Sequence, residues 1–286
     1  MRRAALLLTP VAAMALFFGG VALARGAPSN DRTWAADQAR LPAIRFEGDA
    51  VFLSDIRDFD HTGEGEPRER YRDERYRLDE VQRVWFALAP FANRYRGLAH
   101  TFLTFEFADG RFLAVSVEAR RERDESYGLL GGIFRAFELT YVIGTEEDLL
   151  GVRALRGDTL FLYPARATPA QSRDLFADML RRADATHREP EYYHTLFNNC
   201  NTNLRDHVNR ATPAELPWGW GILLPGFSDE LALREGLLDT DLDLEAARAR
   251  FRVDHHARDA LLRGASDFSG TIRERAASGG QDRPAR

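Results

Sequence analysis

The sequence predicts an α+β fold in which an antiparallel sheet packs with helices, because strand-like runs come first along the chain and helix-like runs follow. The clearest strand pattern is HTFLTFEFADGRFLAVSVEARRE, residues 100–122. Its two runs of aromatic and β-branched residues flank Asp109-Gly110, a strong hairpin turn. The clearest helix pattern begins at Thr168-Pro169, a cap residue followed by a proline at the first helical position.

The strands before and after this hairpin are predicted from short apolar runs. The runs AIRF and AVFLSDIRDF, which begin at Ala43 and Ala50, are typical of strands. Residues 60–77 are charged and predict an exposed loop, with a final strand over 75–78. The run LDEVQRVWFALAPF, residues 78–91, is compatible with a strand or a helix. Two further strands are expected over 137–143 and 158–164, the second stopped by Pro164.

The C-terminal part of the chain is predicted to be helical. A helix from Pro169 to about Ala183 has its apolar stripe at Leu175, Phe176, Met179 and Leu180. A second helix is expected from Cys200 to about Arg210, with Asn198 or Asn199 as its cap. A rigid loop then precedes two helical pieces over 228–264. We expect a catalytic domain over 25–240, a helical extension over 241–276 and a disordered tail over 277–286.

The N-terminus indicates export. Arg2 and Arg3 precede an apolar run from Ala4 to Ala24, and Ala22-Leu23-Ala24 fits a signal-peptidase site. We expect residues 1–24 to be a signal peptide, with an uncleaved membrane anchor as the alternative, because the run is long enough to span a bilayer. Either way the domain is expected in the periplasm. A net charge of −5 argues against a nucleic-acid partner.

The chain has a single cysteine, Cys200, in HTLFNNCNTNL. A lone thiol in an exported protein is a buried filler, an intermolecular bridge or a reactive group. The asparagines around it argue against an apolar pocket, and a helix start stabilises a thiolate and lowers its pKa. We therefore predict a cysteine nucleophile, with the amides flanking it at Asn199 and Asn201 as oxyanion donors.

A cysteine nucleophile needs a base, and we expect His100, which begins a rigid strand. His194 is the alternative, and a purely structural role for His100 also remains open. Glu118 on the partner strand is the candidate to orient the base. A three-residue loop over 108–110 places Glu118 opposite His100, whereas a two-residue turn points it away. The three-residue loop is favoured, and pairing of Glu118 with a nearby arginine is the competing role.

Four segments in this order resemble one family: GLAHTFLTFEFADGRFLAVSVEARRE, FELTYVIGTEEDLL, YHTLFNNCNTNL and LLPGFSDELALREGLLD. Together, from about Trp34 to about Leu238, they are similar to the DUF4105 family, the Lnb N-terminal periplasmic domain. That family resembles circularly permuted NlpC/P60-like papain folds, in which the histidine precedes the cysteine. The resemblance implies lipoprotein N-acylation, with Cys200, His100 and Glu118 as the catalytic residues. Asn201 departs from the threonine of many relatives.

These observations favour a periplasmic, thiol-dependent acyltransferase acting on lipoprotein or lipid acyl esters at the membrane surface. The alternatives are a cysteine amidase or peptidase on cell-wall peptides and a non-enzymatic accessory module. No metal or other cofactor is expected, because neither a ligand spacing nor a phosphate-binding glycine pattern occurs. The loop around Trp218 and Trp220 is expected to be buried, with contact to lipid as the alternative.

Overall fold

The structure is a computed structural model that describes Gly20 and residues 26–63, 65–91, 97–133 and 136–277. The predicted signal peptide or anchor and the predicted disordered tail lie outside the described residues, Gly20 and Ala277 apart. Within the described part of the chain, no helix combines the length and the apolar character that crossing a bilayer requires.

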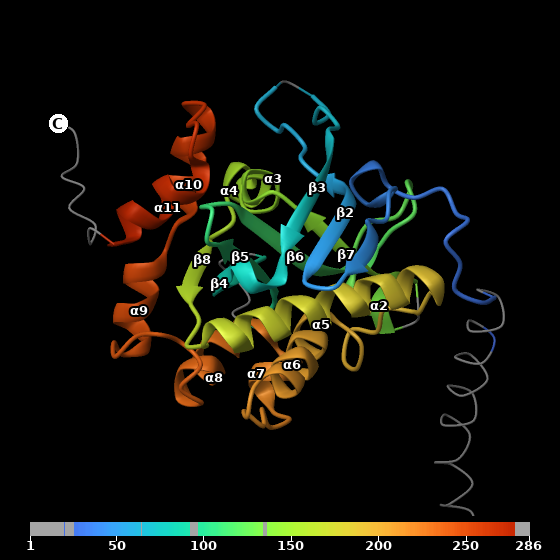
Figure 1. The fold of residues 1–286 in the computed structure, drawn as a ribbon. Helices are drawn as coiled ribbons and strands as arrows, with labels where there is room; N and C mark the ends of the chain where they lie inside the picture. Colours follow the sequence, from blue (N-terminus) through green and yellow to red (C-terminus); the bar gives the residue numbers. More distant parts are fainter. Residues whose placement is uncertain (1–19, 21–25, 64, 92–96, 134–135, 278–286) are drawn as a thin grey trace, which may run out of the picture.

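An eight-stranded sheet forms the centre of the molecule and confirms the α+β prediction (Figure 1). Its neighbours are antiparallel except at one point, where Arg57 pairs with Gly144 in parallel. The strand order is β1 (Ala43–Glu47), β2 (Ala50–Arg57), β7 (Glu138–Gly144), β6 (Phe112–Arg120), β5 (Ala99–Phe107), β4 (Val81–Pro90) and β8 (Phe161–Pro164), and β3 (Tyr71–Arg77) pairs with β2.

The structure decides one open prediction and corrects another. The run over 78–91, which was compatible with either structure, forms a short 3-10 helix, Leu78–Glu80, and then strand β4. Strand β3 begins at Tyr71, well inside the predicted loop. All but one of its side chains are exposed or half-buried at the edge of the sheet, so its composition has the charge of a loop although its backbone pairs with β2.

Helices cover both faces of the sheet (Figure 1). On one face α5 (Pro169–Arg188) and α6 (Cys200–Ala211) pack on a core that includes Phe105 and Phe176. On the other face the core includes Phe102 and Ile272. Phe102 and Phe105 lie on opposite faces because successive strand side chains alternate. The helices of this second face are α3 (Glu146–Leu149), α4 (Gly151–Arg156), α10 (Asp254–Leu262) and α11 (Phe268–Ala277).

The C-terminal helices correct several predicted boundaries. Helix α5 continues to Arg188, beyond the predicted end near Ala183. The predicted loop after α6 contains a short helix, α7 (Trp220–Leu223), and a 3-10 turn. The two pieces predicted over 228–264 are three helices, since Gly236 turns the chain after the first and Asp243 caps the second. They are α8 (Ser228–Arg234), α9 (Leu244–Phe251) and α10, and a further short helix is α2 (Leu129–Ile133).

The hairpin between β5 and β6 has the predicted three-residue loop. Phe107 N–H donates to the Arg111 carbonyl over 2.9 Å, and Gly110 has a φ of 84°, the left-handed conformation that glycine favours. From this loop the β5–β6 ladder runs only as far as Leu103 opposite Val115. Beyond that pair β5 stays paired with β4 and β6 stays paired with β7, so the sheet forks between them.

Candidate functional site

Cys200 is the first residue of α6, as predicted. Of the two candidate caps, Asn199 fills the position: its side-chain oxygen accepts a hydrogen bond from Thr202 N–H over 2.9 Å. The Thr202 hydroxyl oxygen accepts one from Asn199 N–H in return, also over 2.9 Å. This capping box defines where the helix begins and therefore where the thiol sits.

The asparagines around the thiol do not keep it in a polar pocket. The Asn199 amide donates to the Thr195 carbonyl, and the Asn201 amide donates to the carbonyls of Gly221 and Ile222. Cys200 itself is only 5% exposed and belongs to the buried core. The prediction that the neighbours exclude burial was therefore wrong, because asparagine side chains can satisfy backbone groups while the thiol points elsewhere. The Asn199 and Asn201 side chains are committed to these bonds.

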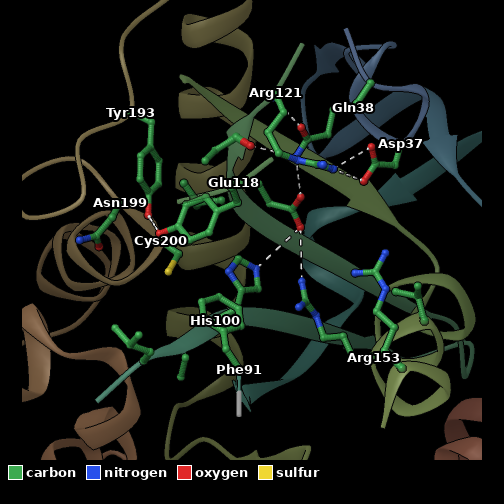
Figure 2. Close-up of a pocket in the computed structure, with 18 of the residues that line it drawn as sticks. Asp37, Gln38, Phe91, His100, Glu118, Arg121, Arg153, Tyr193, Asn199 and Cys200 are labelled. Atoms are coloured by element: carbon green, nitrogen blue, oxygen red, sulfur yellow. Dashed lines mark hydrogen bonds and ion pairs between the residues drawn. The ribbon is translucent and has the colours of Figure 1, made fainter. Parts of the chain in front are cut away.

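A cavity of about 1220 Å³ lies at the fork in the sheet, and Cys200 lines it together with His100 from β5 and Glu118 from β6 (Figure 2). The separation of the two strands makes the room between them. The structure thus brings the three residues predicted to be catalytic into one cavity. Apolar and cationic side chains line other parts of its wall. The apolar ones include Phe91, Leu98, Ile133, Leu196, Leu223 and Leu224, and the arginines are Arg57, Arg121, Arg123, Arg153 and Arg156.

His100 and Glu118 face each other across the fork, and a third residue lies between them. His100 Nε2 is 3.7 Å from Glu118 Oε1 and 2.7 Å from the Ser116 hydroxyl oxygen. That hydroxyl donates to Glu118 Oε1 over 2.9 Å. Sequence analysis missed Ser116, although a residue two positions before Glu118 on a strand must share its face. Gln38 was missed as well, and its amide donates to the other carboxylate oxygen of Glu118 over 3.0 Å.

These contacts determine which nitrogen of His100 can act as a base. Because the Ser116 hydroxyl gives its proton to Glu118, it can only accept from His100, so Nε2 carries the hydrogen. Nδ1 is then the unprotonated nitrogen of the neutral ring. Figure 2 shows that nitrogen on the side of the ring that faces Cys200. No hydrogen bond joins the two residues among the described contacts.

Burial keeps both reactive groups neutral. Desolvation, reinforced by the positive charge of Arg153, lowers the pKa of His100 to about 3. Desolvation raises the pKa of the Cys200 thiol, and hydrogen bonds from Thr101 only partly offset that effect. The predicted lowering of the thiol pKa by the helix start was therefore wrong, because loss of hydration outweighs it. Burial also opposes ionisation of Glu118, but the adjacent imidazole, Arg57 and Arg153 outweigh burial and lower its pKa to about 2.

Two tyrosines that sequence analysis did not single out lie beside the thiol. The hydroxyl oxygens of Tyr127 and Tyr193 are 3.4 Å apart, and both residues line the cavity. Figure 2 places Tyr193 next to Cys200. Burial is the main reason that the pKa of each phenol is raised, and the nearby Cys200 adds to the effect. Both phenols are therefore proton donors at neutral pH. Nothing in their sequence context distinguishes them from core tyrosines.

The other histidines have different surroundings. His194, the alternative base, does not line the cavity and accepts a hydrogen bond from Leu196 N–H at Nδ1. His207 is fully buried between Tyr141 and Asp178. His61 does line the cavity, where its Nε2 lies 2.8 Å from Asp148. Among the described residues, no group of His, Cys, Asp and Glu side chains is arranged to hold a metal ion.

The loop after α6 is only partly buried, contrary to prediction. Leu216 and Ile222 are buried, whereas Trp218 is 54% exposed and Trp220 is 74% exposed. Trp218 contacts Arg205, whose guanidinium carbon lies 4.8 Å from the centre of the indole ring. The glycines allow the apolar half of the loop to turn inward while the indole rings remain at the surface near the cavity residues Leu223 and Leu224.

Comparison with known proteins gives one match. A family model described as the Lnb N-terminal periplasmic domain matches residues 68–226, a range that includes all three predicted catalytic residues. No curated protein and no solved structure matches the chain.

Proposed function

The chain belongs to the Lnb N-terminal periplasmic domain family, and from this premise we propose that it is a thiol-dependent acyltransferase acting on lipoprotein or lipid acyl esters at the membrane surface. The observation that carries the proposal is the shared cavity of Cys200, His100 and Glu118. A nucleophile, a base and a group that orients the base are the parts that acyl transfer through a thioester requires. A histidine on a strand that precedes the cysteine helix also supports the permuted papain-like architecture.

The first step begins from a neutral pair. As the Cys200 sulfur attacks the ester carbonyl, His100 Nδ1 takes the thiol proton in the same step, so the buried thiol does not have to ionise beforehand. The C–O bond of the ester then breaks, the thioester C–S bond forms, and the imidazolium returns its proton to the leaving alkoxide. During this step the hydrogen-bonded Ser116 and the ionised Glu118 stabilise the positive charge on the ring.

The second step releases the acyl chain. An amine attacks the thioester, His100 accepts the amine proton, and the sulfur leaves as a thiolate that regains the proton. The products are an amide and the free thiol. Water in place of the amine yields a carboxylic acid by the same route, so the acceptor alone separates a transferase from a hydrolase.

The negative oxygen formed in each step needs donors. The Cys200 backbone N–H lies in the first turn of α6, where it has no partner within the helix. The second donor in this proposal is the hydroxyl of Tyr193, which lies next to Cys200 (Figure 2). These two groups replace the Asn199 and Asn201 side chains, whose amides are already bound to carbonyls. The apolar part of the cavity wall suits the acyl chain.

The test is to incubate the purified chain with a synthetic diacylglyceryl lipopeptide and follow Cys200 and the peptide by intact mass spectrometry. We expect an acyl adduct that is absent in Cys200→Ala and His100→Ala, followed by an acylated peptide amine. Release of free fatty acid without amide assigns a lipid hydrolase instead. Cleavage of cell-wall peptides without any acyl adduct assigns the amidase alternative. If Cys200→Ala has full function in cells, the protein is an accessory module.

A further inference from the structure

Arg153 of α4 is a half-buried cation that donates no hydrogen bond to the described residues. Its side chain is 14% exposed and lines the cavity, yet its guanidinium donates no hydrogen bond to any described residue, and its Nε is fully enclosed. The other arginines with little exposure behave differently. Arg57 and Arg120 each bond through all three guanidinium nitrogens, and Arg273 bonds through two. A buried guanidinium has five N–H donors, and leaving them unpaired costs free energy.

Among the described residues, Glu118 is the only acid within ion-pair distance of Arg153, and its near oxygen already accepts another hydrogen bond. Glu118 Oε1 lies 3.6 Å from Arg153 Nη2, beyond good hydrogen-bond geometry, and the same oxygen accepts from Ser116. The Phe102 ring, with its centre 5.4 Å from the guanidinium carbon, covers the cation without offering an acceptor. Arg156, one turn later on the same helix, lines the cavity too and is exposed. This wall of the cavity therefore presents N–H donors without hydrogen-bond acceptors, together with positive charge.

We propose that Arg153 binds an anionic group of the acyl substrate, a phosphate or a carboxylate, and that Arg156 extends this subsite towards solvent. The planar guanidinium matches two oxygens of either group and would satisfy the donors that the protein leaves unpaired. Burial lowers the pKa of Arg153, which indicates a charge that its surroundings compensate incompletely. Identification of the ligand as substrate rests on the proposed function, whereas anion binding itself does not.

The subsite lies within electrostatic reach of the reacting sulfur. The charge of Arg153 is among the influences that lower the pKa of Cys200, although desolvation is the largest influence and raises it. A bound anion at Arg153 would thus place a nearby ester in the same cavity as the thiol. The apolar residues of the cavity wall are available to the acyl chain, so the cavity suits an amphiphile with one anionic group.

The competing role for Arg153 is purely positional, holding Glu118 in its ionised form. The two roles differ in what a neutral ligand experiences. If Arg153 only positions Glu118, replacing Arg153 alters the turnover rate, but its effect on affinity does not depend on the charge of the ligand. If Arg153 is a subsite, replacing it weakens the binding of anionic ligands alone.

The experiment measures binding by titration calorimetry to full-length Cys200→Ala protein, which cannot turn over an ester. The probes share two octanoyl chains: dioctanoyl phosphatidic acid, dioctanoylglycerol hemisuccinate and neutral dioctanoylglycerol. We expect the anionic probes to bind about tenfold more tightly than the neutral one, as one charge-assisted pair provides. Arg153→Gln should abolish that difference and Arg153→Lys should retain part of it. Arg166→Gln, an exposed arginine that does not line this cavity, is the control.

Preference for phosphate alone or for both anions identifies the ligand chemistry and supports the subsite. Equal binding of all three probes, or equal weakening of all three by Arg153→Gln, overturns it. If circular dichroism shows that Arg153→Gln does not fold, the subsite is tested with Arg156→Gln and with competition by inorganic phosphate for the Cys200→Ala protein. Absence of competition also overturns the subsite. If Cys200→Ala protein prefers the anionic probes but the wild-type protein forms no acyl adduct, the subsite is retained and the proposed function is lost.

Discussion

His100 and Glu118 face each other at the fork between β5 and β6, with Nε2 3.7 Å from Oε1 and the Ser116 hydroxyl bonded to both. The three-residue hairpin loop sets this register, and the separation of the strands leaves the room that Ser116 fills. The serine bridges the 3.7 Å between His100 and Glu118 with two directed hydrogen bonds. It thereby assigns the proton to Nε2 and leaves Nδ1 for the thiol.

Ser116→Ala tests this relay. Loss of the hydroxyl removes the group that sets the tautomer of His100, and we expect acyl transfer to slow by about 10- to 100-fold, part of what a positioned general base supplies. The measurement is single-turnover acylation of Cys200 by mass spectrometry. Ser172→Ala is a matched control, because Ser172 is a buried serine on α5 whose hydroxyl has no partner. A rate unchanged in Ser116→Ala would remove the serine from the mechanism.

Alkylation of Cys200 tests the neutral resting state. Burial raises the pKa of this thiol, so little thiolate exists at neutral pH. We expect carboxamidomethylation by iodoacetamide to be slow near neutrality and to accelerate with pH beyond the ordinary thiol range of about 8.5. Cys200 is the only cysteine, so total adduct mass reports it directly. Rapid alkylation that is independent of pH above about 6 would instead indicate a preformed thiolate.

Acid should destabilise the fold through its buried histidines. Burial lowers the pKa of both His100 and His207, so the unfolded chain binds more protons than the folded one below the ordinary histidine pKa. The contribution of the neutral histidines to the free energy of unfolding is therefore complete above about pH 6.5. It is lost as the pH falls below that value, by up to about 1.4 kcal/mol per pH unit for each histidine. Glu118 contributes in the same direction, but only below its ordinary pKa of 4.5.

The measurement is urea unfolding of the wild type and of His100→Gln between about pH 5 and pH 7.5, the range that contains the ordinary histidine pKa. The glutamine side chain can still form a hydrogen bond with Ser116. The free energy of unfolding of His100→Gln should fall less steeply with decreasing pH than that of the wild type. His255→Gln is the control, because His255 is 77% exposed, and its slope should equal that of the wild type. Identical slopes in all three proteins would contradict the assignment of His100.

The C-terminal extension should be required for stability. Arg273 of α11 pairs with the buried Glu146 of α3 and also donates to Thr104 of β5. Arg273→Ala leaves that carboxylate without its partner, and we expect a loss of about 3 kcal/mol or more. Chemical denaturation measures the loss, and Arg263→Ala, an exposed residue on the neighbouring segment, serves as the control. A loss below about 1 kcal/mol, the size typical of a surface pair, would mean that α11 docks by apolar contacts alone.

Local patterns along the chain sufficed for much of the fold. The Asp109-Gly110 turn, the capped proline before α5 and the asparagine before Cys200 each depend on neighbours within a few residues, and each was confirmed. The boundaries that failed have non-local causes. Strand β3 owes its structure to pairing with β2, although its composition is that of a loop.

The sequence by itself determined the helix that begins at Cys200 and favoured the register that aligns His100 with Glu118, because caps and tight turns are encoded by adjacent residues. The structure then decided between the two possible hairpin loops. Only the tertiary structure decided the burial of the thiol, the insertion of Ser116 and the lack of hydrogen bonds to the Arg153 guanidinium among the described residues. Those properties arise at the cavity where β5 and β6 separate, which residues of α4 and α6 also line. Desolvation and partner choice there depend on residues far apart in the chain, which no local pattern records.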